Sequence, residues 1–95
     1  MANETADRFR VLLSCPDRRG IVAEVSRLLA EQGANVTAAA QFTDPASHQF
    51  FVRYEVETDS GSVTSTSLQA GLAAGLADLL QQPNAALTVR RADHE

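Results

Sequence analysis

The chain has 95 residues and a formal net charge of −4, which fits one small domain with a single hydrophobic core and leaves no room for a second domain. The acidic balance argues against a nucleic-acid partner, and no apolar run reaches the roughly 20 residues of a membrane span. The single cysteine, Cys15, excludes an internal disulfide and favours a reducing, cytoplasmic location. Residues 1–7 are polar, do not resemble a signal peptide, and are predicted to form a flexible tail.

The first predicted element is a strand over residues 8–14. Phe9, Val11 and Leu13 lie on one side of it, and Arg8, Arg10 and Leu12 lie on the other. Proline cannot donate to a strand ladder, so we expect a break at Cys15-Pro16-Asp17, where Asp17 can cap a helix. A helix then runs from Arg18 to a stop at Gly33. Its apolar stripe consists of Ile21, Val22, Val25, Leu28 and Leu29.

Two further alternating segments, residues 35–42 and 50–57, predict a β-hairpin around a turn at residues 43–48. In the first segment, Val36, Ala38, Ala40 and Phe42 alternate with Asn35, Thr37, Ala39 and Gln41. In the second, the more apolar face consists of Phe50, Val52, Tyr54 and Val56.

A second helix is predicted after a loop over residues 59–65, with a capping box at Thr66-Ser67-Leu68-Gln69. Its apolar stripe consists of Leu68, Leu72, Leu76, Leu79 and Leu80. Gly71 and Gly75 fall inside this helix, where each costs about 1 kcal/mol relative to alanine. We expect them to let the helix lie close to a sheet. Pro83-Asn84 ends the helix, and residues 87–90 form a last short strand.

This order of elements predicts an α+β fold, a ferredoxin-like βαββαβ sandwich whose four-stranded antiparallel sheet carries both helices on one face. We predict one domain over residues 8–91, with flexible tails at 1–7 and 92–95. The uncovered sheet face is expected to be mixed in polarity, and either solvated or in contact with another subunit. Its predicted side chains are Leu12, Thr37, Ala39, Phe51, Arg53 and Thr88.

The turn between the first strand and the first helix is the main candidate site. A helix start presents backbone N–H groups and a positive dipole end, which suit an anionic or zwitterionic ligand. Gly20 either leaves those groups open or allows the helix to pack closely on the strand. Asp17 either accepts an ammonium group or caps its own helix. Arg18 and Arg19 either pair with a carboxylate or are solvated.

The segment Pro16-Asp17-Arg18-Arg19-Gly20-Ile21-Val22, in a chain with this order of elements, resembles the ACT domain family. Residues 13–23, 29–36, 41–45 and 50–55 are also similar to the N-terminal regulatory domain of formyltetrahydrofolate deformylases. The resemblance is close over residues 8–57, whereas the second helix and the last strand agree only in pattern.

The resemblance implies a regulatory domain that binds an amino acid of the glycine, methionine or serine class and forms a homodimer. It places the effector between the turn of one copy and the second strand of its neighbour. Carried over by position, the site residues are Asp17, Arg18, Arg19, Gly20, Ile21, Val22, Asn35, Val36 and Thr37.

In that family the domain precedes a formyltransferase-like hydrolase domain, which cleaves 10-formyltetrahydrofolate to formate and tetrahydrofolate and balances one-carbon pools for purine biosynthesis. The hydrolase half is missing from these residues, so we expect no enzyme activity from this chain alone. The resemblance leaves two forms open: a regulatory piece of such a hydrolase, or a stand-alone relative.

Two other functions stay open. An assembly module would dimerise and bind no ligand. An acylphosphatase-like enzyme would use Arg18 or Arg19 with Asn35, although the glycine-rich turn of that family is not seen here. Cys15 has no histidine nearby in sequence, and His48 with Asp44 supplies too few ligands for a metal. We therefore predict no catalytic residue, no metal and no cofactor.

Overall fold

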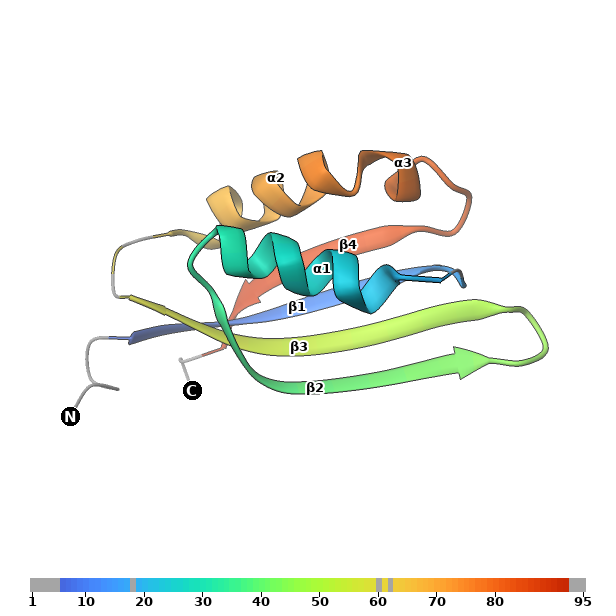
Figure 1. Ribbon diagram of the computed structural model, residues 1–95, viewed down its shortest axis with the longest axis horizontal. Coiled ribbons are helices and arrows are strands. Elements are labelled where there is room, and N and C mark those ends of the chain that lie inside the picture. The colour runs from blue at the N-terminus through green and yellow to red at the C-terminus, as the bar shows by residue number, and fades with distance from the viewer. Residues whose placement is uncertain (1–5, 18, 60, 62, 93–95) are drawn as a thin grey trace.

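A computed structural model describes residues 6–17, 19–59, 61 and 63–92. The elements are β1 (Ala6–Pro16), α1 (Ile21–Glu31), β2 (Asn35–Asp44), β3 (Gln49–Asp59), α2 (Ser65–Gly75), α3 (Ala77–Leu80) and β4 (Ala86–Arg91). The strands form one antiparallel sheet in the order β2-β3-β1-β4, and the helices lie on one face of it (Figure 1). The ferredoxin-like βαββαβ sandwich predicted from the sequence is thus confirmed.

Strand β1 is longer than the alternation predicts. It begins at Ala6, and the Asp7 carboxylate accepts a hydrogen bond from the Gly61 N–H at 3.0 Å and pairs with Arg91 at 3.1 Å. The strand also continues through Cys15 to Pro16, which stands last in the ladder opposite Gln49, where a missing N–H is tolerated. Of the two predicted tails, residues 1–5 and 93–95 lie outside the described residues.

The hydrophobic core lies between the sheet and the helices. The central strands β1 and β3 bury their alternate residues as predicted, and α1 and the α2–α3 segment cover them. The burial of this apolar surface is the main source of stability, at about 25 cal/mol for each Å² removed from water. The largest side chains that are fully buried are Tyr54, Phe9, Leu29, Leu68, Leu72, Leu79, Val11, Val25, Val56 and Cys15.

Helix α1 buries a narrower stripe than its apolar pattern suggests. Ile21, Val25, Leu28 and Leu29 are buried, but Val22, at the margin of the stripe in the first turn, remains 37% exposed. The helix ends as predicted before Gly33, which adopts a φ of 80° that glycine tolerates without strain. The result is an exposed apolar side chain beside the start of the helix.

A β-bulge in β2 overturns the simple alternation predicted for residues 35–42. Val36 pairs with Val56, but the register then shifts by one residue, so that Ala38 pairs with Glu55. Beyond the bulge, Ala39 lies opposite the buried Tyr54 and therefore on the helix side of the sheet. The prediction that Ala39 lies on the uncovered face is wrong, because a bulge transfers every following side chain to the other face.

The second helix begins earlier and packs differently than predicted. Its N-cap is Thr64, whose side chain accepts a hydrogen bond from the Ser67 N–H at 3.0 Å, so the capping box starts two residues before Thr66. An added Cβ at Gly71 would meet the side chain of Gln32, and one at Gly75 would lie 2.5 Å from a Leu28 methyl carbon. The nearest neighbours of these two glycines therefore belong to α1 and to its C-cap residue, Gln32.

Candidate functional site

The turn between β1 and α1 is held against the β2–β3 hairpin. The Asp17 N–H donates to the His48 carbonyl oxygen at 2.8 Å, which fixes the end of β1 beside the start of β3. Asp17, Arg19 and Gly20 are exposed, and Arg18 lies outside the described residues. Gly20 has φ 83° and ψ 4°, a left-handed conformation that side-chain-bearing residues rarely adopt. The turn thus depends on glycine at this position.

Gly20 is also the N-cap of α1, and among the described residues no side chain forms a capping hydrogen bond there. Of the two roles left open for Asp17, capping of this helix is not observed, because Asp17 lies three positions before the N-cap. The Glu24 N–H donates to the Gly20 oxygen at 2.9 Å, so the N–H groups of residues 21–23 precede the first intrahelical bond. Apart from its two chain neighbours, no described residue has an atom within 4 Å of a Cβ built on Gly20, and the backbone at the helix start is therefore open on that side.

The second half of the predicted site lies at the other end of the sheet. Asn35, Val36 and Thr37 are exposed at the start of β2. Within the bulge, the Thr37 hydroxyl donates a hydrogen bond to the backbone carbonyl oxygen of Glu55 at 3.1 Å. Asn35 pairs with Glu57, whereas Pro16, at the turn, pairs with Gln49. The distance from residue 49 to residue 57 along β3 is roughly 27 Å, at about 3.4 Å per residue.

One chain therefore does not bring the two halves together. Helix α1 runs from the turn at one end of the sheet to the start of β2 at the other (Figure 1). Only a second copy, with its β2 placed beside the first copy's turn, can complete a site from these residues.

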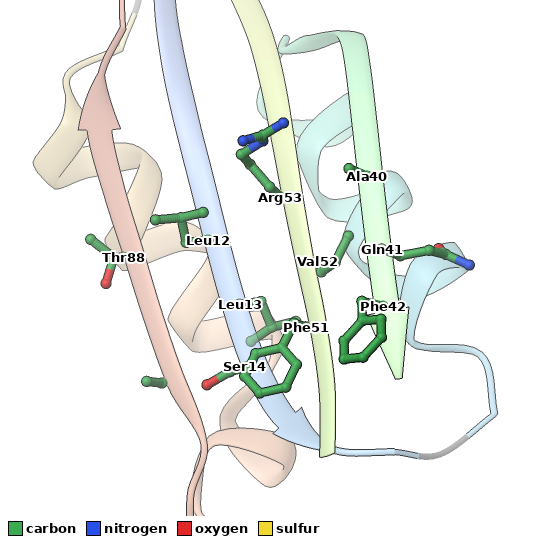
Figure 2. Close-up of a pocket in the computed structure, with 11 residues that line it drawn as sticks. Leu12, Leu13, Ser14, Ala40, Gln41, Phe42, Phe51, Val52, Arg53 and Thr88 are labelled. Atoms are coloured by element: carbon green, nitrogen blue, oxygen red, sulfur yellow. The ribbon is translucent and has the colours of Figure 1, made fainter. Parts of the chain in front are cut away.

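A hollow on the uncovered sheet face was not singled out from the sequence. It has a volume of about 560 Å³ and lies over β1, β2, β3 and β4, on the side away from the helices (Figure 2). Its floor carries side chains from the four strands, among them Leu12, Ala40, Phe42, Phe51, Arg53 and Thr88. The sequence placed Leu12, Phe51, Arg53 and Thr88 on this face, but the bulge in β2 adds Ala40 and Phe42.

Three carboxyl and hydroxyl groups have displaced pKa values. The Gly61 N–H and Arg91 lower the pKa of Asp7, and the Ser47 hydroxyl lowers that of Asp44. Burial raises the pKa of Tyr54. Asp7 lies in β1, Asp44 is the last residue of β2 and Tyr54 lies in β3, so none of the three lies in the turn before α1.

Within the described ranges, no group of three or more histidine, cysteine, aspartate or glutamate residues could hold a metal ion. None of the helices in this part of the chain is long and apolar enough to cross a membrane. The Cys15 thiol is buried.

The family model for the ACT domain matches residues 9–68, and the chain belongs to this family of regulatory domains. The chain is 44% identical over 68 residues to a formyltetrahydrofolate deformylase from Bacillus subtilis, covering 70% of the chain and 23% of that protein. It is 33% identical over 104 residues to one from Synechocystis sp., covering 99% of the chain and 35% of the relative.

Among solved structures, a formyltetrahydrofolate deformylase from Pseudomonas putida superimposes with a TM-score of 0.76 at 28% identity, covering 94% of this chain and 30% of the other. The chain thus spans between 23% and 35% of the length of these three relatives. It is an ACT domain related to one region of the deformylases.

Proposed function

We propose that the chain senses an amino acid at a site that two copies share. One copy contributes the turn, residues Asp17, Arg18, Arg19, Gly20, Ile21 and Val22, and the other contributes Asn35, Val36 and Thr37 at the edge of its sheet. The observation that carries the proposal is the open helix start at Gly20, where no described residue other than the two chain neighbours has an atom within 4 Å of an added Cβ.

The chemistry of the turn fits a zwitterion. The N–H groups at the start of α1 suit a carboxylate, because the helix dipole is positive there. Asp17, which does not cap the helix, is left to accept an ammonium group. Val22, 37% exposed, offers an apolar contact for a small side chain. These features favour glycine, serine or methionine as the effector.

Strand β2, at the edge of the sheet, offers a surface on which a second copy can pair. Residues 35–43 of β2 are all exposed, and β2 is paired only with β3. This edge carries no lysine, arginine or proline to block a further strand. A homodimer formed through this edge would place the exposed N-terminal end of β2 near the turn of its partner.

The similarity to deformylases supports a cytoplasmic role in one-carbon metabolism and purine biosynthesis. In this role the domain would regulate a hydrolase that converts 10-formyltetrahydrofolate to formate and tetrahydrofolate, either as part of that protein or as a stand-alone relative. The chain by itself would carry no hydrolase activity.

Calorimetric titration with glycine, serine and methionine tests the binding claim. A ligand at 100 times its Kd adds about 2.7 kcal/mol to stability, so an upward shift in melting temperature should accompany the heat. The variant Val22→Asp should abolish binding, because its carboxylate competes for the same helix start, while the free domain stays at least as stable. Val22→Ala is the matched control and should retain binding.

Two results would contradict the proposal. One is the absence of heat and of any melting shift with all three amino acids at millimolar concentration. The other is unchanged binding in Val22→Asp. A stable dimer that ignores amino acids would instead favour the assembly module.

A further inference from the structure

We propose that the hollow on the uncovered face of the sheet binds a small amphipathic anion, made of a flat apolar group and a single carboxylate. Its volume of about 560 Å³ lies within the range of roughly 300–1,000 Å³ that is usual for small-molecule sites. The hollow faces away from α1, so this site is separate from the proposed amino-acid site and does not depend on it.

The apolar part of the hollow is built around two phenylalanines. Phe42 of β2 and Phe51 of β3 are cross-strand partners, and their rings stack at 6.4 Å between centroids with 26° between planes. They remain 60% and 43% exposed, and Leu12 of β1 beside them is 38% exposed. Large apolar side chains left this open in one cluster mark a site for an apolar partner. A flat ring can extend the existing stack.

The charged part of the hollow is Arg53. It lies two residues from Phe51 on the same face of β3, about 7 Å away along the strand. Figure 2 shows the two rings side by side and the Arg53 side chain further along β3. Because the Arg53 side chain extends away from the rings (Figure 2), the ligand must be longer than this backbone spacing, as an aromatic ring with a carboxylate on a short side chain is.

The other arginines of this face on β1 already have acidic partners. Arg8 pairs with Glu57 at 3.1 Å and Arg10 with Glu55 at 3.5 Å. The Arg53 side chain, in contrast, forms no hydrogen bond or ion pair within the described part of the chain. Its guanidinium can therefore take a carboxylate from outside the chain. The hydroxyl groups of Ser14 and Thr88 line the same hollow and offer further polar contacts.

Indole-3-acetate is a suitable probe, because the chain contains no tryptophan and the indole fluorescence of the ligand is not masked. The probe also lacks the ammonium group of an amino acid, so it separates this site from the one at Gly20. We expect its fluorescence anisotropy to rise and saturate as the full chain is added. The neutral analogue indole-3-acetamide should bind at least about fivefold more weakly, which corresponds to about 1 kcal/mol.

Matched variants locate the site. Arg53→Gln should raise the Kd for indole-3-acetate about fivefold or more, and Phe42→Ala should weaken binding of both probes. Arg90→Gln removes an equal charge from β4, outside the hollow, and should leave the Kd unchanged.

The proposal is overturned if indole-3-acetate does not saturate at millimolar protein, or if Arg53→Gln and Arg90→Gln bind alike. A third contrary outcome is a dimer in sedimentation that Phe42→Ala converts to a monomer, with no probe binding. In that case a second copy occupies this face. Failure of the amino-acid titration would not affect any of these results.

Discussion

At the scale of single residues, the two glycines of α2 have different tolerances although both face α1. An added Cβ at Gly71 meets the amide end of Gln32, a flexible and partly exposed side chain. At Gly75 it lies 2.5 Å from one methyl carbon of Leu28 and 3.1 Å from its branch carbon, in a side chain that is 7% exposed. The side chain that each glycine contacts therefore determines whether a substitution by alanine raises or lowers the stability of the domain.

We predict that Gly71→Ala stabilises the domain and Gly75→Ala destabilises it. At Gly71, Gln32 moves aside and the gain in helix propensity, up to about 1 kcal/mol, raises the melting temperature by about 4–8 °C. At Gly75, displacement of the packed Leu28 costs about 1–3 kcal/mol. Thermal unfolding of the two variants gives the answer. A Gly75→Ala domain as stable as Gly71→Ala would contradict this packing.

The contacts of Asp7 with Gly61 and Arg91 make the stability of the domain depend on pH. The Gly61 N–H and Arg91 favour its ionised form and lower its pKa below the usual 3.8. Such a carboxylate contributes stability above its unfolded-state pKa, and this contribution is lost as the pH falls through the lower folded-state value.

We therefore predict that Asp7→Asn is less stable than the parent at neutral pH and that the two converge as the pH falls below 3.8. Urea unfolding at a series of pH values measures the gap. A gap for Asp7→Asn that is the same at every pH would show that its pKa is not shifted.

At the scale of the elements, alternation and helical spacing were sufficient to place all four strands and both helical regions. They failed where one residue changes the geometry. The bulge in β2 lies in a run of small residues, Thr37 to Ala40, where no residue type in the sequence indicates it. Because of this bulge, Phe42 lies on the same face as Phe51. The hollow on that face was therefore beyond sequence reasoning.

The start of α2 shows a second limit. Thr64, Ser65, Thr66 and Ser67 all have hydroxyl groups that can cap a helix, so composition does not identify the N-cap. The break at Leu76, which separates α2 from α3, likewise has no proline as a signal. Both features arise from packing against the rest of the domain.

We predict that Thr64→Ala destabilises the domain by about 1 kcal/mol, because the Ser67 N–H loses its acceptor. Thr66 is the second residue of α2, and Thr66→Ala should change stability by less than about 0.5 kcal/mol. Chemical denaturation of both variants distinguishes the two possible caps. An equal loss in both, or a larger loss in Thr66→Ala, would refute the assignment of the N-cap.

At the scale of the whole molecule, the sequence identified the turn at Gly20 but not the span that separates it from Asn35. The distance follows from the topology: α1 carries the chain from one end of the sheet to the other before β2 begins. A ligand that contacts both segments must therefore lie between two molecules. Amino-acid binding should accordingly require dimerisation of this domain.

Backbone amide NMR of the ¹⁵N-labelled chain, titrated with methionine, glycine and serine, tests this most directly. For the effector, the amide signals of Gly20, Ile21 and Val22 should shift together with those of Asn35, Val36 and Thr37, along one saturation curve. Shifts confined to one of the two segments, or no saturable shift in either with any of the three amino acids, would contradict a shared site.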